Sequence, residues 1–121
     1  MLVRLDPNDS SPLYTQIASQ LRRAIAEGKV AQGERLPAAR ELAEALEVNM
    51  HTVLRAYDEL RSEGVLEVRR GRGVVVLESG QGRARLAQLA RHFLAEGLRQ
   101  GLSLRDLKKM LEQSDAQGNT A

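Results

Sequence analysis

Apolar residues recur every three or four positions along the first half of the chain, which is the spacing of one buried helix face. This spacing predicts three helices, at about residues 12–27, 38–46 and 50–63. Their apolar positions are Leu13, Ile17, Leu21 and Ile25, then Ala39, Leu42, Ala43 and Leu46, then Val53, Ala56, Tyr57 and Leu60.

Residues that favour helix ends mark the limits of these segments. A polar arm, residues 1–10, precedes Ser11 and Pro12, which predict a first helix with Ser11 as its N-cap. Asn49 is a suitable N-cap for the third helix, so only residues 47–49 separate it from the second. A break this short is typical of a helix-turn-helix.

The pattern becomes that of β-strands after Gly64. Residues 65–69 alternate apolar and polar side chains, and residues 74–77 are apolar and mostly β-branched. The glycine-containing turn between them predicts a hairpin. Three helices followed by a hairpin predict a winged helix-turn-helix, a mainly α fold with one small β-hairpin.

The remaining residues predict a second, smaller region. The chain divides into a winged helix-turn-helix domain at 1–78, a linker at 79–82, a two-helix dimerisation region at 83–113 and a disordered tail at 114–121. Apolar spacing predicts the two helices at about 83–99 and 104–113. Ser103 and Asp106 have the spacing of a capping box at the start of the second one.

About 40 residues are too few to form a stable core alone. The apolar side chains of the two-helix region must therefore pack either on the same chain or on a second copy, and we favour a second copy. The candidate dimerisation residues are Leu86, Leu89, Phe93, Leu94, Leu98, Leu104, Leu107 and Leu111. A two-fold dimer would set two DNA-reading helices roughly 34 Å apart and demand a palindromic site.

Net charge does not by itself indicate a nucleic-acid partner. The chain carries a formal charge of +2, but residues 1–80 hold 11 basic against 12 acidic side chains, and residues 81–121 hold 7 against 4. Phosphate binding needs a local basic surface, so the positions of the arginines decide the matter.

The start of the third helix and the hairpin tip carry the candidate DNA-binding side chains. In a helix-turn-helix, the N-terminal end of the second helix enters the major groove. That end presents Met50, His51, Thr52, Leu54 and Arg55 off the apolar stripe. Thr52 suits a phosphate or base edge, and Arg55 a phosphate or guanine. The hairpin tip offers Arg69, Arg70, Gly71 and Arg72, which suit a minor groove.

Several spaced motifs within about residues 12–77 together resemble the GntR family of bacterial regulators. They are Leu36-Pro37-Ala38-Ala39-Arg40-Glu41-Leu42-Ala43, Val48-Asn49-Met50-His51-Thr52-Val53, Ala56-Tyr57, Leu60, Glu63-Gly64 and Arg70-Gly71-Arg72-Gly73. The short two-helix C-terminal part is similar to the YtrA-type subfamily. The resemblance implies a homodimeric transcription regulator, usually a repressor, on an inverted-repeat operator. The DNA contacts that it implies fall on Arg40, Asn49, His51, Thr52, Arg55, Arg70, Gly71 and Arg72.

Three positions depart from the family pattern. Ala38 stands where Ser is usual, which removes an N-cap worth about 0.5–2 kcal/mol. Glu47 replaces a common Gly at a turn expected to need a left-handed backbone. Leu54 replaces a common Arg, so a thymine-methyl contact can replace one base contact. These changes bear on the operator sequence and not on the fold.

Other chemistries have little support. The chain has no cysteine and two histidines, His51 and His92, far apart in sequence, so we expect no metal site. No motif of a hydrolase, metalloprotease or nucleotide-binding enzyme is present, so we expect no catalytic residue and no cofactor. The alternative function is a winged-helix protein-interaction module without specific DNA binding, which the slightly acidic residues 1–80 would fit.

Alternatives also stay open for single features. Arg40 could pair with Glu44 on its own helix, and the hairpin arginines could form a solvated turn. A small-molecule effector could bind between the two regions if residues 79–82 were flexible. The chain lacks an 18-residue apolar run and a signal-peptide pattern, so we expect a cytoplasmic protein with no membrane partner.

Overall fold

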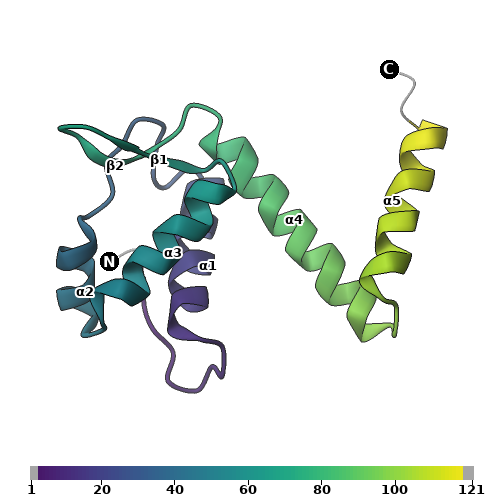
Figure 1. The fold of residues 1–121 in the computed structure, drawn as a ribbon, viewed down its shortest axis with the longest axis horizontal. Helices are drawn as coiled ribbons and strands as arrows, with labels where there is room; N and C mark the ends of the chain where they lie inside the picture. Colours follow the sequence, from purple (N-terminus) through teal and green to yellow (C-terminus); the bar gives the residue numbers. More distant parts are fainter. Residues whose placement is uncertain (1–2, 119–121) are drawn as a thin grey trace. The chain divides into compact units, whose positions relative to one another are not determined.

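The structure is a computed structural model that describes residues 3–118 as two compact units, the first reaching Ala87 and the second starting at Gln88. The first unit contains α1 (Leu13–Ala26), α2 (Ala39–Leu46), α3 (Met50–Ser62), β1 (Leu66–Arg69), β2 (Gly73–Val76) and the first turns of α4 (Gly80–Arg99) (Figure 1). The second unit contains the rest of α4 and α5 (Leu104–Gly118). Three helices followed by an antiparallel hairpin confirm the predicted winged helix-turn-helix.

The core of the first unit forms where α1 packs against α3. The buried side chains at this contact include Ile17, Leu21 and Ile25 of α1 and Val53, Ala56 and Leu60 of α3. Tyr57 is buried beside them, as predicted, and its hydroxyl donates to the Pro37 carbonyl oxygen at 2.6 Å. Burial raises the pKa of the Tyr57 phenol, so the hydroxyl stays a neutral donor. The apolar stripes found in the sequence therefore face one common core.

The hairpin is tied to the connector between α1 and α2. Strands β1 and β2 pair antiparallel, in a register that sets Arg69 opposite Gly73. On its other side β2 bonds to residues 33–36, where the Leu36 N–H donates to the Val74 carbonyl oxygen at 2.8 Å. Because β2 is hydrogen-bonded on both sides, the base of the hairpin is fixed to the helical core.

The first helix starts differently from the prediction. Pro12, not Ser11, is the N-cap of α1, and no side chain caps the helix. Pro12 has an extended backbone (ψ 147°), and its carbonyl accepts the N–H groups of Thr15 and Gln16. The Ser11 backbone N–H instead donates to the Asp9 carboxylate at 2.8 Å. The prediction of Ser11 as N-cap is therefore wrong, because Ser11 belongs to a turn that Asp9 closes.

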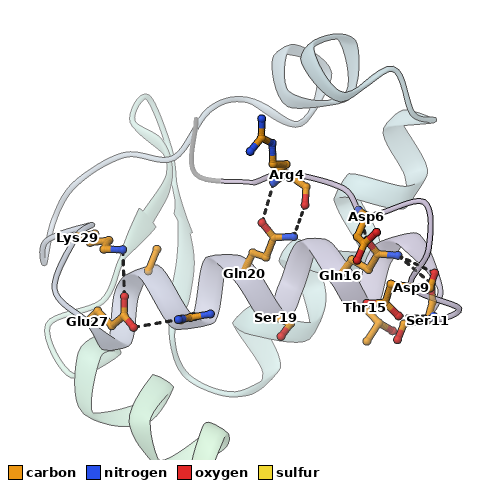
Figure 2. Close-up of a pocket in the computed structure, with 12 residues that line it drawn as sticks. Arg4, Asp6, Asp9, Ser11, Thr15, Gln16, Ser19, Gln20, Glu27 and Lys29 are labelled. Atoms are coloured by element: carbon orange, nitrogen blue, oxygen red, sulfur yellow. Dashed lines mark hydrogen bonds and ion pairs between the residues drawn. The ribbon is translucent and has the colours of Figure 1, made fainter.

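The N-terminal arm is part of the fold and not only a polar extension. Val3 is buried in the core. The Gln20 side chain holds the Arg4 backbone at both its N–H (2.7 Å) and its carbonyl oxygen (2.6 Å) (Figure 2). One turn earlier, the Gln16 side chain accepts the Asp6 N–H at 3.0 Å. Two glutamines of α1 therefore clamp the arm along this helix.

Residues 79–82 do not form the predicted linker. Helix α4 begins at Gly80, which is buried against the hairpin base. A Cβ at Gly80 would lie 2.7 Å from the Val65 carbonyl oxygen and 2.9 Å from Val76 Cγ1. Only a glycine fits this contact, so Gly80 allows the helix to pack closely on the hairpin base and does not indicate a flexible linker. The hypothesis of an effector site at a flexible linker loses its basis.

The next turn of α4 docks on the end of α1. The side chains of Gln81 and Arg85 both donate to the Ala26 carbonyl oxygen at 3.2 Å. Carbonyls in the last turn of a helix lack a partner within it, so these donors satisfy one of them. Ala84, which lies between Gln81 and Arg85 in the sequence, is fully buried. The first unit therefore extends beyond the predicted boundary at residue 78.

The second unit is a helical hairpin with a well-defined turn. Gly101 has a φ of 84°, and the Leu102 N–H donates to the Gly97 carbonyl oxygen at 2.9 Å, which closes α4. The predicted capping box is present: the Ser103 N–H donates to the Asp106 carboxylate at 2.9 Å, and the Asp106 N–H to Ser103 Oγ at 3.2 Å. Hydrogen bonds from the Ser103 backbone and hydroxyl lower the pKa of Asp106. The box is therefore lost only as the pH falls through this lowered pKa.

Helix α5 is longer than predicted and includes residues 114–118, which we expected to be disordered. The apolar spacing stops at Leu111, but no glycine or proline interrupts the helix before Gly118. The rest of the predicted tail, residues 119–121, lies outside the described residues.

Two glycine substitutions in α4 test the junction. Gly80→Ala should lower the free energy of unfolding by about 1–3 kcal/mol, because its Cβ would collide with backbone. Gly82→Ala should instead raise it by up to about 1 kcal/mol, because that Cβ meets no atom within 4 Å and alanine favours helix. Urea denaturation of both variants measures the difference, and equal effects would contradict the buried junction.

Candidate nucleic-acid interface

The turn before α3 is closed by a residue under strain. Among residues 3–118, Glu47 is the non-glycine residue with a positive φ, 57°. Its N–H donates to the Glu44 carbonyl oxygen at 3.2 Å, and the Val48 N–H to that of Ala43 at 3.0 Å. This is the left-handed turn expected from the sequence, where glycine is the least strained residue.

Asn49 begins α3 as predicted. Its backbone is extended, and its side-chain oxygen accepts the His51 N–H at 2.8 Å. Because the apolar stripe of α3 faces α1, the first turns of α3 present their other side chains outward. Met50, His51, Leu54 and Arg55 are exposed, and Thr52 is half-buried.

Helix α2 starts without a side-chain cap. Ala38 is its N-cap residue and accepts no bond through its side chain, which is the consequence expected from the missing serine. Arg40 is exposed in the first turn. Within the described part of the chain, no ion pair joins Arg40 to Glu44, so the alternative role of Arg40 has no support.

A mostly apolar hollow separates α3 from the hairpin, whose tip lies on the same side of α3 as α2 (Figure 1). Leu54 lines it from α3, Val68 and Arg72 from the hairpin, and Ala38 from the start of α2. Arg35 lines it too and lies beside Gly73, with its Cδ 3.6 Å from where a Cβ would be. The sequence does not single out Arg35, because the connector shows no periodicity that predicts its pairing with β2.

A second hollow lies on the other side of α3, against the start of α1. Its lining residues are Leu13, Tyr14, His51, Thr52 and Arg55. The Arg55 guanidinium carbon lies 3.8 Å from the centroid of the Tyr14 ring, and its Nη2 donates to the Tyr14 hydroxyl oxygen at 3.2 Å. The sequence pattern does not single out Tyr14, since a contact across 41 residues leaves no local signal.

The hairpin tip brings the predicted arginines together, but they differ in whether they form an ion pair. Gly71 has a φ of 79°, and the Arg72 N–H donates to the Arg69 carbonyl oxygen at 3.0 Å, which closes the turn. Arg69 forms an ion pair with Glu67 of its own strand. Arg70 and Arg72 are exposed and pair with no carboxylate among residues 3–118. The tip therefore presents two uncompensated positive charges instead of the three expected.

A further pocket, between the N-terminal arm and α1, is unsuited to DNA (Figure 2). Its charged lining residues are three basic and three acidic ones, Arg4, Arg23, Lys29, Asp6, Asp9 and Glu27. Two of the basic ones already bind a carboxylate, since Arg23 and Lys29 each lie 3.2 Å from Glu27. This surface offers little net charge to a phosphate.

The elements of the candidate interface match a known protein family. The family described as "Bacterial regulatory proteins, gntR family" matches residues 13–76, which is more than half of the chain. The chain belongs to the GntR family. The resemblance found in the motifs is therefore confirmed, and the GntR match covers α1 through β2, the elements that carry the candidate interface.

Relatives of this GntR protein are transcription regulators. The HTH-type transcriptional repressor YtrA of Bacillus subtilis is 39% identical over 80 residues, which cover 66% of this chain and 62% of YtrA. The chain thus spans about three fifths of the length of that relative. YtrA from Sulfolobus acidocaldarius, a GntR-family transcription factor, has a TM-score of 0.61 and 36% identity, over 76% of this chain and 97% of that one.

A further solved structure contains DNA. The AraR(DBD) in complex with operator ORX1 has a TM-score of 0.54 and 28% identity, over 61% of this chain and 92% of that one. The chain therefore has the winged helix-turn-helix of the GntR family, and the relatives named here are described as transcription regulators. None of the helices among its described residues is both long and apolar enough to cross a membrane.

Glu47→Gly should raise the free energy of unfolding by about 0.5–1 kcal/mol. Relief of the left-handed strain, about 1–2 kcal/mol, exceeds the added entropy of the unfolded chain. The matched control is Glu44→Gly in the regular part of α2, which should cost about 1 kcal/mol. Thermal melts compare the two, and a destabilising Glu47→Gly would contradict the assigned backbone.

Proposed function

We propose that this GntR regulator is a homodimeric repressor that binds an inverted-repeat operator, with α3 in the major groove and the hairpin near the minor groove. The observation that carries the proposal is the exposed first half of α3, flanked by a hollow with Arg55 on one side and a hollow with Arg72 on the other. Repression is the activity that the name of the Bacillus YtrA states.

The chemistry of α3 fits a major groove that is read partly through apolar contacts. Met50 and Leu54 are exposed apolar side chains, about 36% and 38% accessible, and can touch thymine methyl groups. His51 and Thr52 can bond to base edges or phosphates, and Arg55 can bond a guanine with two donors. Asn49 already caps α3, so a DNA contact from it would use the remaining capacity of its amide.

The positive charge of the interface lies on both sides of α3. Arg70 and Arg72 extend from the hairpin tip, where Gly71 lets the backbone approach the DNA. Arginine is favoured in a narrow minor groove because of its negative potential. Arg40 extends from the first turn of α2, where a helix N-terminus and a cation together suit a phosphate. These contacts set the position of the protein on DNA, while α3 supplies the specificity.

The dimer is supported by the apolar surface of the α4 and α5 segments. Six of the eight predicted dimerisation residues are exposed: Leu86, Leu89, Leu94, Leu98, Leu104 and Leu111. Phe93 is half-buried. Leu107 is the exception, since it is 2% exposed and packs against Gly97 of its own chain, where a Cβ would lie 2.5 Å from it. We assign Leu107 to the packing of the helical hairpin itself.

A second copy is the occupant that we propose for this apolar surface. On α5, the exposed Leu104 and Leu111 lie on the same face as Leu107, at positions three before and four after it. Leaving such leucines in water forgoes about 1.5–3 kcal/mol for each side chain that a partner could bury. A two-fold pairing buries the same residues from both chains and matches an inverted repeat.

Fluorescence anisotropy with the DNA upstream of its own gene, beside a scrambled duplex, tests DNA binding. We expect tighter binding to the upstream DNA, weakened at higher salt. Arg72→Ala should weaken operator binding at least about fivefold and make the slope of log K against log salt about 0.9 shallower. Arg61→Ala is the matched control, because Arg61 lies at the far end of α3 and pairs with Asp58.

Two outcomes would contradict this proposal. Equal losses of operator affinity in Arg72→Ala and Arg61→Ala would mean that only the total charge of the protein affects DNA binding. No binding of the unsubstituted protein to any duplex at low salt would favour the protein-interaction alternative.

Sedimentation equilibrium tests the dimer. Leu89→Glu with Leu111→Glu should convert a dimer into a folded monomer, because a buried unpaired carboxylate is costly. The monomer should bind a full inverted repeat no more tightly than a half-site. Gln113→Glu is the control, since Gln113 is exposed about 200° around α5 from Leu111 and should leave the dimer intact. A monomeric unsubstituted protein that still binds the full repeat tightly would contradict the dimer.

A further inference from the structure

We propose that Tyr14 of α1 is a positioning residue for DNA recognition, which holds Arg55 of α3 ready for its contact with the operator. This inference rests on the proposed function, because it concerns how one of the proposed contacts is made. It starts from the pair described above, with the guanidinium carbon 3.8 Å from the ring centroid and a 3.2 Å hydrogen bond to the hydroxyl.

The pair leaves the binding edge of the arginine free. A guanidinium is planar and carries five N–H donors in its plane. The Tyr14 ring lies under the guanidinium carbon, and the Tyr14 hydroxyl accepts one donor of Nη2. The other four donors lie at the edges of the plane, where a guanine or a phosphate binds with two parallel bonds. Tyr14 thus holds the guanidinium of Arg55 at two points and leaves four of its donors for DNA.

Tyr14 is a neutral partner, so it leaves the positive charge of Arg55 uncompensated, whereas a carboxylate would neutralise it. The other arginines held by side chains in the first unit bind acids: Arg22 binds Glu63, Arg23 binds Glu27, Arg61 binds Asp58, and Arg69 binds Glu67. Each of these charges is compensated, and contact with a phosphate would have to separate the pair. Arg55 makes no ion pair among the described residues, so its full charge stays available.

The core of the first unit holds Tyr14 in place. Tyr14 is half-buried and packs against the buried cluster, in the first turn of α1. Ile17, one turn later, is fully buried against α3. Tyr14 therefore moves with the rigid core, whereas an unsupported arginine on the exposed face of α3 would sample many rotamers. Ordering such a side chain on binding costs affinity, and Tyr14 removes part of that cost before DNA arrives.

A double-mutant cycle with the upstream operator duplex tests the proposal. Tyr14→Leu should weaken operator binding about 2- to 10-fold, which is the cost of ordering one flexible side chain. Tyr14→Phe keeps the ring and should retain most of the operator affinity that Tyr14→Leu loses. In an Arg55→Ala background, Tyr14→Leu should change affinity less than twofold. Thermal melts first establish that every variant is folded to the same extent at the temperature of the binding assay.

A measurement without DNA checks the contact itself. The Arg55 Nε–H resonance in a ¹H–¹⁵N spectrum should be displaced by the ring in the unsubstituted protein and in Tyr14→Phe, and should return toward a free-arginine value in Tyr14→Leu. The inference is overturned if Tyr14→Leu is as damaging with Ala at position 55 as with Arg, or if it leaves operator affinity unchanged while Arg55→Ala lowers it. Failure of the unsubstituted protein to bind any duplex would overturn the proposed function as well, which separates the two results.

Discussion

The packing of α3 on α1 is the contact on which the rest of this molecule depends. Val53, Ala56 and Leu60 of α3 are fully buried, and they occupy a single stripe of the helix. Burial of that stripe fixes the rotation of α3 about its axis, and with it the side chains that point outward. A rotation by one residue, about 100°, would turn Arg55 toward the core and expose an apolar residue. The proposed DNA surface is therefore a consequence of the core.

A buried ion pair sets the position of α3 along α1. Arg22, 2% exposed, binds Glu63 through two hydrogen bonds of 2.8 and 2.7 Å. A pair of this kind adds little net stability, because desolvation offsets the attraction, but separating it is costly. A shift of α3 along α1 that parts Arg22 from Glu63 is thus disfavoured. The apolar stripe and the ion pair together define one arrangement.

The pairing of arginines explains how a domain without excess positive charge can present a cationic surface. Arg22, Arg23, Arg61 and Arg69 have carboxylate partners, whereas Arg40, Arg55, Arg70 and Arg72 have none among the described residues. The acidic residues of the domain neutralise the first group and leave the second group unpaired. Local charge and not the total then governs the affinity for phosphate. Arg69 differs from Arg70 and Arg72 because Glu67 neutralises it, although the sequence places all three arginines on one hairpin tip.

The sequence by itself determined the features that depend on local spacing. The apolar periods located the three helices of the domain, turn glycines located the hairpin, and Asn49 and the Ser103–Asp106 box marked helix starts that the structure confirms. Spaced motifs also identified the family, since they reflect core and turn positions that many members share.

Only the tertiary structure decided features in which distant segments meet. The glycine at position 80 is a close packing site and not a linker, because Val65 lies against it. Val3 is buried because Gln16 and Gln20 hold the arm along α1. Tyr14 reaches Arg55 across 41 residues. Periodicity reports which side of an element is buried, but the identity of its neighbour depends on the folded path of the chain.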